Sequence, residues 1–284
     1  MYAPVFGLSV TFKSEATPEE MVSQLRRFGF TALEFNAGYV ERHGESLSVL
    51  RQELDHLTYH LPHQGEFSAL PPDPRDDEQV LKALKAQFDL GASVGCRTFT
   101  FHLKNPLGQR IEEYWSRSVA FARRLGALAQ ERESMVGLEN CYPVVRSGEV
   151  ARQFLDEVDS PAVGLTLDTG HFWSALCEDE FGHHKENPVM RTREGNRILN
   201  RMCSEMVRAV GDRIVNIHIH NIRASDWLDH QPVDSGVMQY EEFFRILRDI
   251  GYQRTVIVEI RPTEDWVGFE SSARYLQHFR GVDA

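Results

Sequence analysis

The sequence predicts an α/β protein built as a single closed (β/α)8 barrel of the TIM type. Short apolar segments alternate with amphipathic segments eight times along the chain, and such alternation gives a parallel sheet with right-handed crossovers. The length of 284 residues suits eight such units in one barrel. No G-x-G-x-x-G motif follows the first strand, which disfavours an open dinucleotide-binding sheet.

Eight short apolar segments are the strand candidates. In chain order they are Val5–Val10, Ala32–Asn36, Leu57–Leu61, Thr98–Leu103, Val136–Cys141, Val163–Asp168, Ile214–His220 and Thr255–Ile260.

A helix is expected after each strand, and the first has the clearest boundaries. Thr17 is placed to cap it, Pro18 stands at its first position and Glu20 follows the cap by three residues. Gly29 is expected to end it. The third helix is predicted from Val80, Leu84, Phe88 and Ala92, which share one face. The other helix candidates are Ser46–Leu54, Glu112–Arg132, Gly148–Val158, Asn196–Val210, Tyr240–Ile250 and Phe269–Phe279.

Residues 1–284 are expected to form one domain, because no Gly/Ser-rich linker divides the chain. A Pro-rich loop is expected at 70–77. A His- and charge-rich stretch at about 172–193 is expected to be an insertion after the sixth strand, acting as a lid or an oligomer contact.

Composition excludes several classes of protein. Lys and Arg total 31 against 42 Asp and Glu, a formal charge of −11, which disfavours nucleic acid or an anionic membrane as a partner. No apolar run approaches the roughly 18 residues of a membrane span. The N-terminus does not resemble a signal peptide, and the four cysteines are scattered without a C-x-x-C pair. We therefore expect a cytoplasmic protein with reduced thiols.

Polar residues gather where the predicted strands end, which is where catalytic groups lie in such barrels. Glu139, Asp168 and Glu259 stand there, although ionised carboxylates are rarely buried unless they are paired or bind metal. These three acids and several imidazoles predict a divalent-metal site, for Mn²⁺, Mg²⁺ or Co²⁺, or for Zn²⁺ if more histidines bind. Seven of the twelve histidines occupy such positions: His60, His63, His102, His171, His218, His220 and His230.

The motifs at these strand ends resemble those of a known group of proteins. Their order resembles that of the xylose-isomerase-like TIM-barrel superfamily, over about residues 30–262. This superfamily includes sugar phosphate isomerases and epimerases, and the AP endonucleases of the endonuclease IV group. The motifs are YHLP (59–62), FHL (101–103), LEN (138–140), LDTGH (167–171), HIHN (218–221), DHQPVDSG (229–236) and VEI (258–260).

The resemblance implies that Glu139, Asp168, Glu259 and one histidine of the seventh strand bind the metal. His218 fits the H-x-x-D spacing of the family, whereas His220 fits the H-x-H pattern of the epimerases. Both lie on the same face of the strand, and we favour His218 as the ligand and His220 as a contact to substrate or to a ligand. Further contacts to substrate or additional metal are expected from His171, His230, His60, His102, Arg261 and Trp173.

One departure from the family pattern concerns the loop after the seventh strand. Leu228 stands where the acid of the D-x-H motif is expected, and Asp229 is adjacent to the histidine instead. The register of this loop therefore stays open at the level of sequence.

The leading functional hypothesis is a metal-dependent isomerase or epimerase of a ketose, aldose or related polyol. Glu139 and Glu259 would transfer protons through a metal-stabilised enediolate. A dehydratase or lyase could use the same carbanion chemistry. An endonuclease IV-like zinc phosphodiesterase is a further alternative, motivated by the additional histidines, but the negative charge disfavours it. A barrel that binds a ligand without catalysis is a third hypothesis, which the acids retained at the strand ends disfavour. A small-molecule sugar or polyol is the expected partner, and a homo-oligomer is a further possibility.

Overall fold

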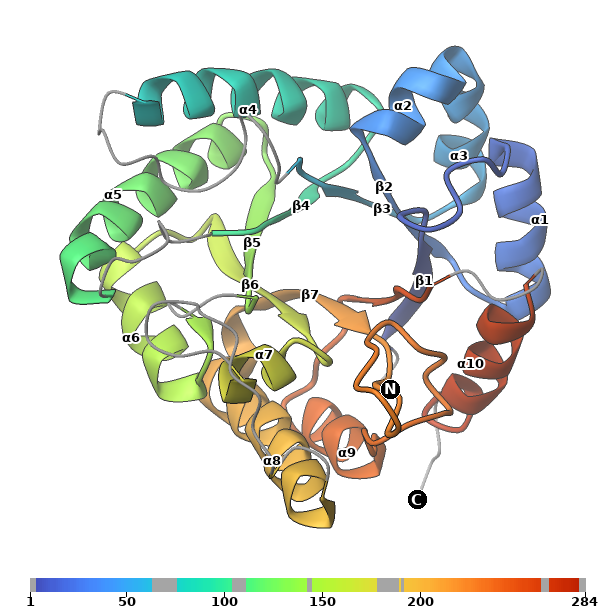
Figure 1. Ribbon diagram of the computed structural model, residues 1–284. Helices are drawn as coiled ribbons and strands as arrows, with labels where there is room; N and C mark the ends of the chain where they lie inside the picture. The colour runs from blue at the N-terminus through green and yellow to red at the C-terminus, as the bar shows by residue number, and fades with distance from the viewer. Residues whose placement is uncertain are drawn as a thin grey trace.

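Eight parallel strands form a closed barrel in sequence order, with β1 hydrogen-bonded to both β2 and β8 (Figure 1). The predicted fold class is thereby confirmed. The structure is a computed structural model, and it describes residues 4–62, 76–103, 111–141, 145–177, 189, 192–261 and 266–280. The strands are β1 Val5–Ser9, β2 Ala32–Asn36, β3 His56–His60, β4 Thr98–Phe101, β5 Met135–Glu139, β6 Val163–Asp168, β7 Ile214–Ile219 and β8 Thr255–Val258.

Helices surround the barrel on the outside (Figure 1). No helix among the described residues is long and apolar enough to cross a lipid bilayer. The helices are α1 Pro18–Phe28, α2 Ala37–His43, α3 Ser48–Glu53, α4 Asp76–Ser93, α5 Ile111–Gln130, α6 Gly148–Val158, α7 Phe172–Cys177, α8 Arg193–Val210, α9 Glu241–Asp249 and α10 Val267–Gln277, with 3₁₀ turns η1 Gly44–Leu47 and η5 Gly211–Arg213.

The local signals around α1 act as the sequence predicts. The Thr17 hydroxyl accepts a hydrogen bond from the Glu20 backbone N–H, and Pro18 stands in the first turn. Gly29 ends the helix with a φ of 69°, a left-handed conformation that glycine adopts without steric cost.

The segment between β2 and β3 differs from the prediction. One helix at Ser46–Leu54 was expected, but α2 starts directly after β2 and is followed by η1 and the short α3. The physical reason is a cap: the Asn36 side chain accepts a hydrogen bond of 3.1 Å from the Tyr39 backbone N–H. Tyr39 and Val40 are buried, so α2 is also held by packing.

Several predicted features lie wholly or mainly outside the described residues. They include His63 and nearly all of the Pro-rich loop at 70–77. Of the expected insertion at 172–193, the described parts are chiefly α7 and the start of α8, which begins three residues earlier than predicted.

Alternate residues of each strand face the interior of the barrel, and several of these residues are polar. The hydroxyls of Thr58 and Thr100 donate hydrogen bonds to the Glu34 carboxylate, and so does the Asn216 amide. All four side chains are buried. The apolar residues of the same strands pack outward against the helices, so the main hydrophobic core lies between strands and helices. The polar layer thus lies beneath the carboxyl ends of the strands.

Candidate metal centre

Three carboxylates and one imidazole converge at the carboxyl ends of β5 to β8. Glu139 and Asp168 are the last residues of β5 and β6, His218 lies in β7, and Glu259 follows β8 directly. None of the four is more than 5% exposed. The structure therefore brings together the four residues that the sequence nominated as ligands.

His218 lies between the two glutamates. Its Nδ1 atom is 3.1 Å from Glu259 Oε2 and 3.7 Å from Glu139 Oε2. His218 and Glu139 are both buried. The ligand atoms of Glu139, Asp168 and His218 all lie within 4.8 Å of one another. Buried oxygen and imidazole donors in this arrangement fit a divalent cation.

Asp168 is fixed in place from three sides. Its Oδ1 accepts hydrogen bonds of 2.8 Å from the backbone N–H groups of Gly170 and His171. His220 Nε2 lies 3.0 and 3.1 Å from its two oxygens. The Asn140 amide joins β5 to β6 by exchanging two hydrogen bonds with the Asp168 backbone. Asn140 thus has a structural role that explains the LEN motif.

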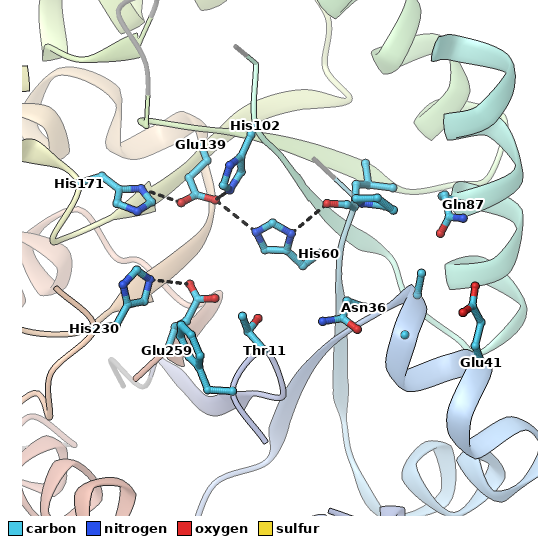
Figure 2. A pocket seen from close by; sticks show the side chains of 15 residues that line it. Thr11, Asn36, Glu41, His60, Gln87, His102, Glu139, His171, His230 and Glu259 are labelled. Atoms are coloured by element: carbon cyan, nitrogen blue, oxygen red, sulfur yellow. Dashed lines mark hydrogen bonds and ion pairs between the residues drawn. The ribbon is translucent and has the colours of Figure 1, made fainter. Parts of the chain in front are cut away.

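Three further histidines surround Glu139 (Figure 2). His102 Nε2 lies 2.7 Å from Oε2, His171 Nδ1 lies 2.9 Å from Oε1, and His60 Nε2 lies 3.6 Å from Oε2. These three side chains were expected to contact substrate or a further metal. In the structure, all three imidazoles contact the Glu139 carboxylate and form one cluster with it.

The loop after β7 resolves the register that the sequence left open. Asp229 Oδ1 lies 3.1 Å from His230 Nδ1 and 2.6 Å from the Arg261 guanidinium. Asp229 therefore pairs with His230 in place of the acid expected at Leu228. His230 has a φ of 54°, a strained conformation for a residue with a side chain, and its Nε2 lies 3.9 Å from Glu259 Oε2.

The electrostatics of the centre favour ionised carboxylates. Burial raises the pKa of Glu139, but the histidines facing it, led by His102, outweigh burial and hold this pKa well below its usual value. Burial lowers the pKa of His171, yet Asp168 and Glu139 raise it to about 10. His102 behaves differently, because burial prevails there and lowers its pKa. Negative charge at the centre is thus balanced by neighbouring imidazoles.

A cavity of about 760 Å³ opens above these groups. Glu139, Glu259 and His171 line one end, and Asn36, Glu41 and Gln87 line the other (Figure 2). Asp168, His218 and His220 lie beneath its wall, fully buried. Among the described residues, the remaining lining residues are Thr11, Phe12, Ala37, Gly38, His60, Leu61, Pro62, His102 and His230.

Three predicted substrate contacts, His220, Arg261 and Trp173, are not among the described residues that line this cavity. Arg261 is held by Asp229 and lies over the ring of Phe12. Trp173 is half-buried and packs against the hydrophobic core. In the described geometry, neither the Arg261 nor the Trp173 side chain is placed to contact a molecule in the cavity directly.

One residue that contacts the centre was not among the site residues expected from sequence, although it is one of the polar residues near the strand ends. Glu34 is fully buried in β2, and its Oε1 lies 2.9 Å from His218 Nε2. The available signal was a carboxylate enclosed in the apolar run Ala32–Phe35, since an isolated buried charge is costly.

Comparison with known proteins identifies the family. The sequence matches the model for the xylose isomerase-like TIM barrel over residues 22–277. The chain belongs to this family.

Individual proteins are also similar to this chain in sequence or in structure. L-ribulose 3-epimerase of Methylomonas sp. (strain DH-1) is 26% identical over 194 residues, which cover 67% of this chain and 57% of that relative. The D-psicose 3-epimerase of Clostridium cellulolyticum H10, solved with D-tagatose, superimposes with a TM-score of 0.70 at 15% identity, covering 99% of both chains. A D-tagatose 3-epimerase-like protein gives 0.69 at 16% identity, covering 98% of this chain and 97% of that one. These structural likenesses concern the fold.

Proposed function

We propose that this protein is a metal-dependent isomerase or epimerase of a sugar or related polyol. The observation that carries the proposal is the pairing of Glu139 and Glu259, two buried carboxylates that meet at His218 Nδ1 and also line the cavity. Such a pair can handle a proton on either side of a bound molecule. The names of the three similar proteins given above, which are sugar 3-epimerases or a protein like one, support the same chemistry.

Each residue of the centre has a proposed part in this reaction. Glu139, Asp168, Glu259 and His218 would hold the cation, and when bound a divalent ion polarises a substrate carbonyl and so acidifies the neighbouring C–H group. One glutamate, ionised, would accept the proton from that carbon, and the other, entering the step protonated, would deliver its own proton. Delivery to the opposite face of the same carbon gives epimerisation. Isomerisation would instead need a proton delivered to the carbonyl carbon, with the neighbouring hydroxyl proton moving to the carbonyl oxygen.

The glutamate pair can be tested with isosteric variants. Glu139→Gln and Glu259→Gln are each expected to lower turnover by roughly 10²- to 10⁴-fold, because an amide cannot accept the proton. Turnover of D-psicose, D-tagatose and L-ribulose in D₂O would be followed by NMR, which reports deuterium entering the reacting carbon. Metal content measured on each sample separates loss of proton transfer from loss of the ion.

The matched control is Glu19→Gln, which removes an exposed carboxylate from the first turn of α1 and should leave turnover unchanged. Near-full activity in both cavity variants, with wild-type metal content, would contradict the assignment of the two glutamates.

A second candidate function is metal-assisted phosphodiester hydrolysis by a multinuclear site. It is favoured by clusters of potential metal ligands that share acids. One cluster contains Glu139, His60 and His102, and another contains Glu139, Asp168 and His218. A third contains Asp168 with His171, His220 and His230. Shared carboxylates are suited to bridging neighbouring ions. About three zinc ions per chain by elemental analysis would favour the phosphodiesterase, and about one Mn²⁺ or Mg²⁺ the epimerase.

A further inference from the structure

Glu34 is a fully buried carboxylate in β2 that lies below the centre, whereas His218 belongs to β7. Both of its oxygens approach the same nitrogen of His218: Oε1 lies 2.9 Å and Oε2 lies 3.1 Å from Nε2. An ionised carboxylate can only accept hydrogen bonds. The Asn216 amide also lies 3.3 Å from this nitrogen, but it donates to Glu34 Oε2 at the shorter distance of 2.9 Å. The His218 nitrogen that faces Glu34 therefore carries the proton.

The Glu34 carboxylate is itself held in a fixed orientation. Thr58 Oγ1 donates to Oε2 at 3.2 Å, Asn216 Nδ2 at 2.9 Å and Thr100 Oγ1 at 3.4 Å. All three donors belong to the buried polar layer of the barrel. Because Oε2 is held by donors from β3, β4 and β7, the Glu34 carboxylate presents a rigid hydrogen-bond acceptor to the imidazole.

With Nε2 protonated, the other ring nitrogen of His218 is the one that can bind a cation. That atom, Nδ1, points to Glu139 and Glu259. A histidine ligand commonly donates its second nitrogen to a carboxylate, which fixes the tautomer and the ring plane. We propose that Glu34 is the positioning residue of the metal centre, and that it makes His218 an Nδ1 ligand.

His220 provides the contrast on the same strand face. Its Nε2 lies against Asp168, while its Nδ1 accepts a hydrogen bond of 2.9 Å from the His230 backbone N–H. The lone pair of His220 Nδ1 is thus occupied by a backbone donor, whereas His218 Nδ1 faces the carboxylates of Glu139 and Glu259. This difference selects His218 over His220 as the ligand.

The inference rests on the proposed metal-dependent function, and its test is chosen to be independent of activity. The protein labelled with ¹⁵N-histidine would be loaded with ¹¹³Cd²⁺ and studied by NMR. The expected result is a scalar coupling between ¹¹³Cd and His218 Nδ1, with a proton retained on His218 Nε2. Coupling to His218 Nε2, or to His220 in place of His218, would overturn the inference.

Glu34→Gln tests the cause of this tautomer. The amide oxygen must face Thr58 and Asn216, which donate, so the amide NH₂ faces His218 and forces the proton onto Nδ1. Affinity for Cd²⁺ and Mn²⁺, measured by competition with a chelator, is expected to fall by roughly 10- to 100-fold. Glu34→Asp, which keeps the acceptor at a longer reach, should recover part of this loss.

Thr166→Val is the matched control. Its hydroxyl lies in the same buried layer and contacts Thr100, but it touches neither Glu34 nor His218, so metal affinity should stay at the wild-type value. Wild-type affinity in Glu34→Gln overturns the inference and leaves the proposed function standing. Failure of the wild-type protein to bind any divalent metal removes the proposed function itself. If the glutamine variant does not fold, the cadmium coupling in the wild-type protein still decides.

Discussion

At the scale of single residues, the candidate metal centre depends both on its proposed ligands and on the neighbouring groups that hold those ligands in place. His220 and the backbone N–H groups of Gly170 and His171 all converge on Asp168. Gly170 has a second role, because a Cβ atom there would lie 1.9 Å from His220 Cε1. The close approach of this backbone to the His220 ring requires glycine.

Gly170→Ala is therefore expected to push His220 away from Asp168 and to disturb the ligand. We expect metal affinity to fall by about 10-fold or more and the free energy of unfolding to fall by roughly 1–3 kcal/mol from overpacking. Calorimetric metal titration and urea denaturation measure the two effects.

Gly38→Ala is the control for this change, since its Cβ would meet nothing closer than the Asn36 side chain at 3.5 Å. A Gly170→Ala protein that binds metal as tightly as the wild type would show that the His220 ring can move at no cost to Asp168.

At the scale of elements, α2 shows what sequence periodicity misses. It has only seven residues and few apolar positions, too short a stretch to show a helical period. Its start is set by the Asn36 cap, and its placement brings Glu41 to the cavity end opposite the metal centre (Figure 2). Gln87 from α4 lies at the same end, where Tyr59 donates a hydrogen bond to it.

Glu41 is expected to accept hydrogen bonds from the distal hydroxyls of a polyol. Glu41→Gln should raise KM by about 3- to 10-fold with kcat nearly unchanged, the size of one hydrogen bond of roughly 0.5–1.5 kcal/mol that is made equally before and during the reaction. Steady-state kinetics on the best ketose found for the wild-type enzyme provide the measurement.

Glu19→Gln serves again as the control for loss of one exposed negative charge. An equal KM for the wild type and Glu41→Gln would mean that the substrate does not reach this end of the cavity.

At the scale of the whole molecule, the site exists because the barrel closes. Residues of β2, β5, β6, β7 and β8 meet at one centre only when β1 joins β8. Gly7 lies in β1 at this junction, paired with Ala32 on one side and Ile257 on the other. A Cβ atom at Gly7 would lie 2.4 Å from the Ala32 carbonyl oxygen.

The strands and helices from β1 to α10 all belong to the same barrel. We therefore propose that the chain forms a single barrel domain.

Gly7→Ala is expected to strain this junction and to lower the free energy of unfolding by roughly 1–3 kcal/mol. The midpoint of urea denaturation should shift to lower concentration with little change in slope. An unchanged midpoint would show that β1 and β2 separate locally without loss of closure.

Much of the fold and of the site follows from sequence because it depends on local pattern. The bounds of β2, β6 and α6 were predicted to the residue, since each is an apolar or amphipathic run between clear breakers. The positions of Glu139, Asp168, His218 and Glu259 at strand ends follow from the same pattern, because parallel strands of a barrel present their carboxyl ends at one mouth.

The sequence by itself determined the barrel and the set of acids and histidines at its mouth. Only the tertiary structure decided which partner each of them meets. Glu34 and His218 are 184 residues apart, and His218 and His220 share one strand face, so no local period distinguishes them. Their difference arises from contacts across the barrel: a buried carboxylate orients His218 from below, and Asp168 with the His230 backbone engages both nitrogens of His220.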